Sequence, residues 1–413
     1  MLKDAGIVTQ YTYVEEKMIK AFTKEEYHEG IQIIIYGAGL YGELVFWQLR
    51  AIGIEPAFFA DINHKVKEKL GHRVIRPEEI CNISDAAVIL SSLNGIESMI
   101  QKLKELHVSK FFSASDLLKG ELGEFENRLS EHAKDLYTNR GRKYCFNIEH
   151  YNTDKFIVKN VDLVLTECCS LRCRDCGSLI PYYLKPRHIP VNEITEPFDR
   201  FIDAIDILYE LRLLGGEPFL YPYLKDIISR YGKNERIKVI TIFTNSTIVP
   251  SDEILQAIKD NDINIHISDY GEISTKTEQM SELCEKKGIR HYVHEYRAWR
   301  DMGDLSQRNY STEAVKKMIK ICDNKNCPSF FRGRLYVCPR AAHGEGVGAF
   351  VNLPDEYVDF RNEVNEEIIR KEIKTLLKQK DYFTACMYCN GNSIHAEPIE
   401  AAIQIKSNRG ENN

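Results

Sequence analysis

The sequence predicts an α/β protein with two parallel sheets and a cysteine-rich C-terminal third. First, the glycine-rich turn Gly37-Ala38-Gly39-Leu40-Tyr41-Gly42 follows an apolar run of strand length and opens a helical pattern. Second, strand-like and helical patterns alternate between residues 156 and 300, which is typical of parallel sheets covered by helices. Third, five of the 12 cysteines lie between residues 322 and 389, a density that indicates metal binding.

The glycine-rich turn lies in a region, residues 29–118, that resembles the small Rossmann-like domains of some sugar-modifying proteins. The predicted strands are 31–36, 55–60, 86–91 and 110–113, with helices from the turn to about residue 52 and at 96–107. In such domains the glycines let the backbone approach a diphosphate, and a carboxylate after the second strand meets a ribose hydroxyl. We therefore expect a nucleotide or nucleotide-linked sugar at Gly37, Gly39, Gly42 and Asp61. The alternative is a turn that serves helix–sheet packing and binds no ligand.

Two segments flank this region. Residues 1–28 are predicted to be an N-terminal helical segment. Residues 119–155 are predicted to be a helical linker, charged between 120 and 142, with a turn at 141–143 before the second core.

The second sheet is predicted from a series of strand–helix units in residues 156–304. The expected strands are 161–165, 211–214, 237–243, 263–268 and 291–295, and the expected helices are 193–209, 223–231, 252–259 and 276–287. Ligands of parallel α/β folds lie at the carboxyl ends of the strands. Thr244, Asn245 and Ser268 fall at such ends, where they either contact a ligand or cap the neighbouring helices.

A cysteine loop follows the first of these strands. Cys169, Cys173 and Cys176 have the spacing C-x3-C-x2-C, so one loop can hold three irons of a [4Fe–4S] cluster and leave the fourth iron open. The alternatives are a buried thiol cluster or half of a zinc site. Further along, Gly215-Gly216-Glu217-Pro218 combines two glycines, which permit close backbone approach, with a carboxylate suited to an ammonium group.

These two motifs resemble those of the radical S-adenosylmethionine (radical SAM) enzymes. The resemblance implies a partial (β/α)6 barrel over 156–304, with SAM bound to the open iron through its amino and carboxylate groups. Gly215, Gly216 and Glu217 would hold the amine, and Thr244, Asn245 and Ser268 would contact the ribose or carboxylate. A one-electron donor such as flavodoxin or ferredoxin is also implied. In one departure, Asp175 stands where many members carry an aromatic residue that seats adenine.

The cysteines of residues 305–413 resemble the SPASM and twitch extensions of radical SAM proteins. Cys322, Gly333 and Cys338 follow the pattern C-x10-G-x4-C, and Cys386 and Cys389 follow as C-x2-C. The resemblance implies one auxiliary [4Fe–4S] cluster held by Cys338, Cys386, Cys389 and either Cys322 or Cys327, of which the pattern favours Cys322. A structural zinc held by four of these five thiolates is the alternative. After Cys338, Arg340 and His343 are candidates to face the substrate, although a structural role is the simpler interpretation of each.

Composition indicates a soluble cytoplasmic enzyme. The net charge is −6, with 61 acidic and 55 basic residues intermixed, which argues against nucleic-acid binding. The sequence contains no apolar run long enough to span a membrane and no hydrophobic signal segment at its start.

Three functions follow as hypotheses. The first is a radical SAM oxidoreductase or epimerase of a carbohydrate or nucleotide-linked sugar, which the Rossmann-like region favours. The second is a radical SAM modifier of peptides or proteins, and the third is a non-catalytic iron–sulfur redox sensor. A nicotinamide dehydrogenase is disfavoured because it leaves the cysteines unexplained. The sequence does not identify a catalytic acid or base.

Overall fold

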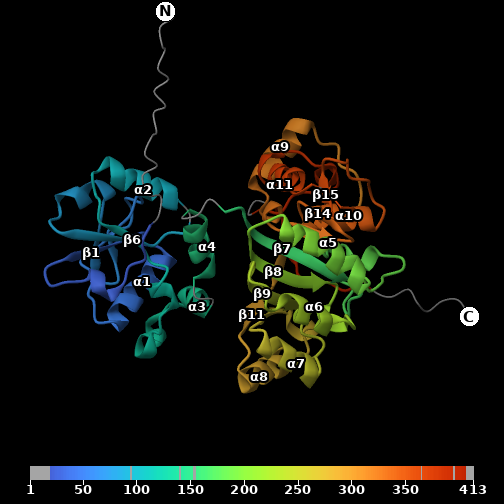
Figure 1. The fold of residues 1–413 in the computed structure, drawn as a ribbon, viewed down its shortest axis with the longest axis horizontal. Coiled ribbons are helices and arrows are strands. Elements are labelled where there is room, and N and C mark those ends of the chain that lie inside the picture. The colour runs from blue at the N-terminus through green and yellow to red at the C-terminus, as the bar shows by residue number, and fades with distance from the viewer. Residues whose placement is uncertain are drawn as a thin grey trace, which may run out of the picture. The chain divides into compact units, whose positions relative to one another are not determined.

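The chain divides into two compact units, Met1–Lys155 and Phe156–Asn413. The structure is a computed structural model that describes residues 19–93, 95–138, 141–151, 155–363, 365–393 and 396–405 (Figure 1). Among these residues, no helix combines the length and apolar character needed to cross a bilayer.

The first unit is built on a six-stranded sheet with the strand order β3-β4-β2-β1-β5-β6. The strands are β1 (Gln32–Tyr36), β2 (Phe58–Ala60), β3 (Glu68–Lys69), β4 (His72–Ile75), β5 (Ala86–Leu90) and β6 (Phe111–Ser113). All neighbouring pairs are parallel except β3 and β4, which form an antiparallel hairpin that the sequence analysis did not predict. The helices are α1 (Leu40–Ala51), α2 (Ile96–Glu105), α3 (Glu131–Thr138) and α4 (Arg142–Tyr151).

Two predictions for the flanks of this unit were wrong. Residues 19–28 contain one short 3-10 turn, Lys24–Glu26, in place of a helix, and Ala21 instead forms a parallel bridge with Ser113 at the edge of the sheet. The remainder of the predicted N-terminal segment lies outside the described residues. The expected linker packs into the first unit, since Leu122, Leu129, Tyr144 and Ile148 join its buried core. The predicted turn at 141–143 is the start of α4.

The second unit contains an eight-stranded sheet with the order β11-β10-β9-β8-β7-β13-β14-β15. Its strands are β7 (Ile157–Thr166), β8 (Ile207–Gly215), β9 (Ile237–Thr244), β10 (Asn264–Asp269), β11 (His291–Glu295), β13 (Ser329–Phe331), β14 (Arg334–Tyr336) and β15 (Tyr357–Asp359). The strands from β11 to β13 in this order are parallel, whereas β14 and β15 are antiparallel additions. The sixth parallel strand therefore comes from the cysteine-rich region, and it was not predicted.

Helices α5 (Val191–Asp203), α6 (Leu224–Tyr231), α7 (Asp252–Asp260) and α8 (Thr277–Lys287) connect these parallel strands. The C-terminal part adds α9 (Thr312–Ile321), α10 (Pro339–Gly346) and α11 (Glu366–Lys374), together with a small sheet of β12 (Ala298–Arg300) and β16 (Pro398–Glu400). The predicted helix 193–209 was too long at its end, because residues 207–209 already belong to β8 and pair with β7 from Ile157 onward.

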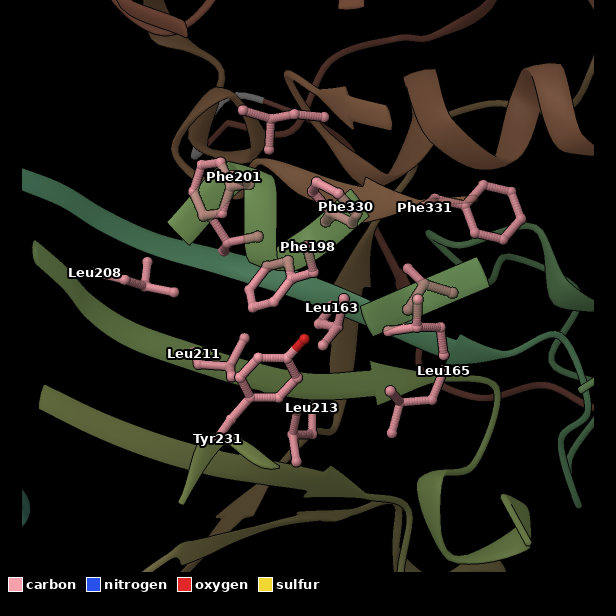
Figure 2. Packing of buried hydrophobic residues seen from close by; sticks show 14 of the residues in the cluster. Leu163, Leu165, Phe198, Phe201, Leu208, Leu211, Leu213, Tyr231, Phe330 and Phe331 are labelled. Carbon is pink, nitrogen blue, oxygen red and sulfur yellow. The ribbon is translucent and has the colours of Figure 1, made fainter. Parts of the chain in front are cut away.

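The core of the second unit lies between the sheet and its helices. Leu163, Leu211 and Leu213 belong to one buried cluster with Phe198 and Phe201 of α5 (Figure 2). Phe330 of β13 joins the same cluster, with its ring centroid 5.0 Å from that of Phe198. Because side chains alternate across a strand, the residues between these leucines face the opposite side of the sheet. That second, inner face is polar.

Candidate active site

The cysteine loop follows β7 and packs tightly against the end of β8. The Glu217 N–H donates to the Cys168 carbonyl at 2.9 Å, and the Gly216 N–H donates to the Thr166 carbonyl at 2.8 Å. A Cβ on Gly216 would lie 2.0 Å from the Cys168 oxygen, and one on Gly215 would lie 2.4 Å from the Thr166 oxygen. Both glycines are therefore required for the contact between the two loops.

The three loop cysteines face one another in a buried environment rich in N–H donors. The Leu171 N–H and the Asn245 amide donate to the Cys169 sulfur at 3.4 and 3.5 Å, and the Gln404 amide donates to the Cys173 sulfur at 3.2 Å. The backbone N–H groups of residues 178–180 face Cys176. Such hydrogen bonds to sulfur are typical of iron–sulfur clusters, so the donor set fits the implied group.

Burial makes these thiols poor acids on their own. It raises the pKa of Cys169 to about 12 and that of Cys173 to about 11, and each neighbouring sulfur adds to the effect. A thiolate at these positions would need a positive partner such as iron. Among the described residues, no three His, Cys, Asp or Glu side chains are grouped as ligands of one metal ion.

Glu217 has a different place from the one expected. Its side chain has no exposed surface, and its carboxylate accepts hydrogen bonds from the Thr244 hydroxyl at 2.9 Å, the Asn245 N–H at 2.9 Å and the Phe219 N–H at 3.1 Å. Burial raises its pKa to about 7, and these donors oppose the shift. Glu217 thus joins the end of β8 to the end of β9. In this conformation its carboxylate is not accessible to a ligand.

The other predicted strand-end residues surround the cysteine loop. Thr244 is buried and engaged by Glu217, and the Asn245 amide donates to Ser170 at 3.1 Å as well as to Cys169. Ser268 is partly exposed at the end of β10, and its side chain bonds Tyr270. The Tyr270 ring interacts with Trp299 edge to face at 5.5 Å. Asn245 and Ser268 therefore lie at the ligand end of the sheet.

Four of the five C-terminal cysteines form a second group. Burial raises the pKa of Cys338, Cys386 and Cys389, that of Cys338 to about 12, and the nearby Cys322 sulfur adds to the shift of all three. The N–H groups of Gly391 and Asn392 donate to the sulfurs of Cys389 and Cys322 at 3.2 and 3.4 Å. This donor set also fits a cluster.

Cys327 has Cys322 as a neighbour but also contacts the inner face of the sheet. Its sulfur is 3.9 Å from the Arg212 guanidinium, and its raised pKa, about 11, reflects burial and then the nearby Asp162. Of the two alternatives that the sequence left open, Cys322 is the one that contributes to the raised pKa of Cys338, Cys386 and Cys389.

Arg340 and His343, the two candidates to face the substrate, are both buried. The Arg340 guanidinium donates to the carbonyls of Gly303, Asp304 and Tyr388 at 2.7 to 3.0 Å. Its charge opposes the burial-raised pKa of both Cys176 and Cys389, so it lies between the two cysteine groups. The His343 imidazole bonds the Tyr183 hydroxyl at 2.8 Å, and burial lowers its pKa to about 3.

In the first unit, packing accounts for most of the glycine-rich turn. A Cβ on Gly42 would lie 2.0 Å from the Gly37 carbonyl oxygen, whereas one on Gly39 would meet nothing within 4 Å. The Asp61 carboxylate accepts from the N–H groups of Ala38 and Asn63, each at 2.7 Å. Asp61 therefore stabilises the glycine-rich turn through its hydrogen bond with Ala38.

The sequence analysis missed the polar inner face of the second sheet. Asp162, Glu210, Arg212, Thr241, Asn264 and His266 occupy alternate positions on four adjacent strands. The sequence of each strand from β7 to β10 shows these polar residues alternating with apolar ones. The pattern within one strand does not indicate which residues of the neighbouring strands lie beside it. Gln404 and Arg332 carried no such signal.

Comparison with known proteins identifies the second unit. Residues 163–334 match the family described as the radical SAM superfamily. These residues form a radical SAM region within the second unit. The cysteine loop, Gly215-Gly216-Glu217-Pro218 and the six parallel strands all lie in this radical SAM region or at its border.

Two curated relatives are named GTP 3′,8-cyclase. The protein of Aquifex aeolicus (strain VF5) is 33% identical over 105 residues, which cover 25% of this chain and 32% of the relative. The protein of Stenotrophomonas maltophilia (strain R551-3) is 36% identical over 94 residues, which cover 21% and 27%. The chain thus spans only 32% and 27% of the length of these two relatives.

Solved structures of similar fold include three proteins with S-adenosylmethionine (AdoMet) bound. BtrN in complex with AdoMet and 2-DOIA is 12% identical, with 58% of this chain and 95% of that chain covered and a TM-score of 0.37. Streptococcus suis SuiB bound to S-adenosylmethionine is 16% identical, with 56% and 51% covered and a TM-score of 0.29. Hexahistidine-tagged anSMEcpe with bound AdoMet is 20% identical, with 33% and 43% covered and a TM-score of 0.27.

Proposed function

We propose that this radical SAM enzyme removes a hydrogen atom from a polyhydroxylated substrate, a carbohydrate or a nucleotide-linked sugar, which it oxidises or epimerises. A reduced [4Fe–4S] cluster and SAM, bound together, supply the 5′-deoxyadenosyl radical for that step. In this proposal Cys169, Cys173 and Cys176 hold the cluster. The backbone of Gly215 and Gly216, with Asn245 and Ser268, holds SAM, while Glu217 and Thr244 keep these strand ends in place.

The inner face of the second sheet is the observation that carries this proposal. Asp162, Arg212, Thr241 and Asn264 are direct neighbours in register across four parallel strands. The side chains of Arg212 and Glu210 are 21% and 19% exposed, so this face is open to a small molecule. Arg212 forms ion pairs with Glu210 at 2.9 Å and with Asp162 at 3.7 Å, so this face offers a partly exposed cluster of charges to a polar ligand.

Several buried polar atoms on this face lack a partner among the described residues. They are the Asn264 amide oxygen and both ring nitrogens of His266. One Asp162 carboxylate oxygen also accepts no hydrogen bond, although it forms an ion pair with the Arg212 guanidinium at 3.7 Å. Burial lowers the pKa of His266 to about 3, so its ring is neutral and offers one donor and one acceptor. Unpartnered buried polar atoms are rare in proteins and indicate a missing partner.

Aromatic residues connect the inner face to the cysteine loop. Cys173 and Cys176 contribute to the raised pKa of Tyr270, after burial and the neighbouring Tyr296. The Tyr296 ring lies 5.7 Å from that of Tyr270 and 6.3 Å from that of His266. A substrate on the inner face would therefore lie next to the site where the radical forms.

The chemistry of the face favours hydroxyl groups. Two carboxylates, one guanidinium, an amide, a hydroxyl and a neutral imidazole pair well with groups that both donate and accept hydrogen bonds. The flanking rings of Phe243 and Tyr292 suit the apolar face of a sugar ring. Asp162 and Glu210 outnumber Arg212, which disfavours a triphosphate at this position.

We further propose an auxiliary [4Fe–4S] cluster at Cys322, Cys338, Cys386 and Cys389. It would accept the electron left on the substrate radical if the reaction is an oxidation, and the initial electron would come from a donor such as flavodoxin or ferredoxin. Metal analysis that found zinc in place of the second set of irons would contradict this assignment.

For the first unit, we propose that a nucleotide or a nucleotide-linked sugar binds beside Gly39, the glycine of the turn with open space around it. Equilibrium dialysis with UDP-glucose and GDP-mannose tests this. A Gly39→Val variant should bind neither, and equal binding by the variant would refute the site.

The main test measures 5′-deoxyadenosine formed from SAM by the anaerobically reconstituted, dithionite-reduced protein. The variant with Cys169, Cys173 and Cys176 changed to Ala should form none and lose one cluster of iron. Free sugars, nucleotide-linked sugars, GTP and peptides are then screened for increased turnover. Stimulation by GTP or by a peptide alone would replace the carbohydrate proposal with a cyclase or a peptide modifier, and a SAM-insensitive cluster would indicate a redox sensor.

A further inference from the structure

A segment close to the end of the described chain pairs with the cysteine loop. Gln404 forms an antiparallel bridge with Cys173, although the two residues lie 231 positions apart. The Arg174 N–H donates to the Ile403 carbonyl at 2.7 Å, and the Ile405 N–H donates to the Arg172 carbonyl at 2.8 Å. The loop that carries the cysteines is thereby extended into a short two-stranded pairing.

Residues preceding Gln404 hold this segment in place. Strand β16 pairs with β12, and the Asp301 N–H donates to the Glu397 carbonyl at 2.8 Å. Ala402 is fully buried and has a φ of 57°, an unusual conformation for a residue with a Cβ. The chain therefore turns sharply just before Gln404 and presents that side chain to the loop.

Every polar atom of the Gln404 side chain has a partner there. Its Oε1 accepts from the Arg172 N–H at 2.7 Å. Its Nε2 donates to the Ala402 carbonyl at 2.7 Å and to the Cys173 Sγ at 3.2 Å. These partners determine the orientation of the amide, because the Arg172 N–H requires an acceptor and the Ala402 carbonyl requires a donor. The amide nitrogen must then face the sulfur.

We propose that Gln404 sets the reduction potential of the SAM-binding cluster by donating a hydrogen bond to its Cys173 ligand. The inference rests on the proposed function, in which Cys169, Cys173 and Cys176 hold that cluster. A hydrogen bond to a ligand sulfur stabilises the more negative, reduced cluster and so raises its potential. The donors to Cys169 belong to the barrel itself, whereas Gln404 makes the cluster sensitive to the docking of a distant segment.

Two substitutions separate the hydrogen bond to sulfur from the pairing of the segment. Gln404→Glu keeps an oxygen to accept from Arg172 but removes the donor to Cys173. Gln404→Leu removes both interactions. Gln256→Leu is the matched control, because Gln256 lies on the exposed surface of α7 and bonds only Asp260 there, at 2.8 Å.

The experiment is a potentiometric titration of the full-length, reconstituted protein, followed by the part of the EPR signal that responds to SAM, with iron measured in parallel. We expect a more negative midpoint potential in both Gln404 variants and no shift in Gln256→Leu. An unchanged potential in Gln404→Glu with full iron would overturn the inference.

The failure of the underlying proposal has a different signature. If the parent protein has no SAM-responsive cluster signal, the proposed function itself is wrong. If Gln404→Leu loses iron while Gln404→Glu retains it and shifts in potential, both the docking and the hydrogen bond are supported. Loss of iron in both variants with no change in potential of the remaining clusters would assign Gln404 to structure alone and refute its effect on potential.

Discussion

The Arg332 guanidinium donates two hydrogen bonds to the Glu167 carboxylate, with the shorter at 2.5 Å. Glu167 directly precedes the cysteine loop and has no exposed side-chain surface, whereas Arg332 lies in the turn between β13 and β14. The Arg187 N–H donates to the same carboxylate at 3.2 Å. This ion pair connects the cysteine loop to the strand pair that the C-terminal region adds to the sheet.

Removing Arg332 should therefore destabilise the second unit. Arg332→Ala leaves the buried Glu167 carboxylate with one weak donor, and we expect a loss of roughly 2 kcal/mol, since Arg332 is itself partly exposed. Chemical denaturation under anaerobic conditions measures this. Arg361→Ala, which breaks an exposed pair with Asp359, is the control and should change stability by less than about 0.5 kcal/mol. Equal effects of the two substitutions would contradict the prediction.

A Cβ at position 216 should displace the cysteine loop. We expect Gly216→Ala to lose the iron of the first cluster and to retain that of the second, because the new Cβ would lie 2.0 Å from the Cys168 oxygen and 2.9 Å from the Cys169 nitrogen. Iron content and EPR spectra report the outcome. Gly39→Ala has no atom within 4 Å of its Cβ and a φ of −80°, so it should keep full iron. Full iron in Gly216→Ala would show that the loop can move aside.

His266→Phe should stabilise the protein and lower its activity. The ring lies against Phe243 at 4.4 Å with both nitrogens unpartnered, so a phenyl group loses no hydrogen bond within the described residues. The pKa of His266 is lowered to about 3, so between pH 3 and about 6.5 the unfolded state binds more protons and the parent loses stability as pH falls. At pH 5.5 this amounts to about 1 kcal/mol, which the variant would not lose.

Thermal denaturation at pH 5.5 and pH 8 tests the stability of His266→Phe, and turnover of SAM with the stimulating substrate tests function. We expect the melting temperature to rise more at pH 5.5 than at pH 8. We also expect at least a tenfold loss of kcat/KM, as for other lost hydrogen bonds to a substrate. His28→Phe, at an exposed site of the first unit, should change neither. Full activity in His266→Phe would remove this residue from the substrate site.

Cys322 and Cys327 should differ in their effect on the second cluster. Cys322 interacts electrostatically with Cys338, Cys386 and Cys389, whereas Cys327 adjoins Arg212. We expect Cys322→Ser to remove the auxiliary iron and Cys327→Ser to retain it. Iron and sulfide analysis of the two variants decides between them, and the opposite pattern would make Cys327 the ligand.

Elements with strong local patterns were predictable. The apolar run of β1, the glycine-rich turn and the alternation from β7 to β11 follow directly from spacing, as does the grouping of Cys169, Cys173 and Cys176. Predicted element boundaries were wrong where pairing with a neighbouring strand lengthened a strand. Residues 207–209, predicted to end a helix, belong to β8 because they pair with β7. The hairpin of β3 and β4 was missed because its strands are too short to show a period.

The sequence by itself determined the motifs by which residues 163–334 match the radical SAM superfamily, because those motifs depend on residues within one loop or one turn. Tertiary structure alone decided which distant residues meet. It showed that Glu217 supports the strand ends, that Cys322 is a neighbour of Cys386, and that the segment 402–405 reaches Cys173. Local spacing specifies a residue's immediate conformation, whereas contacts across the chain depend on the register of the sheet and on the packing of its faces.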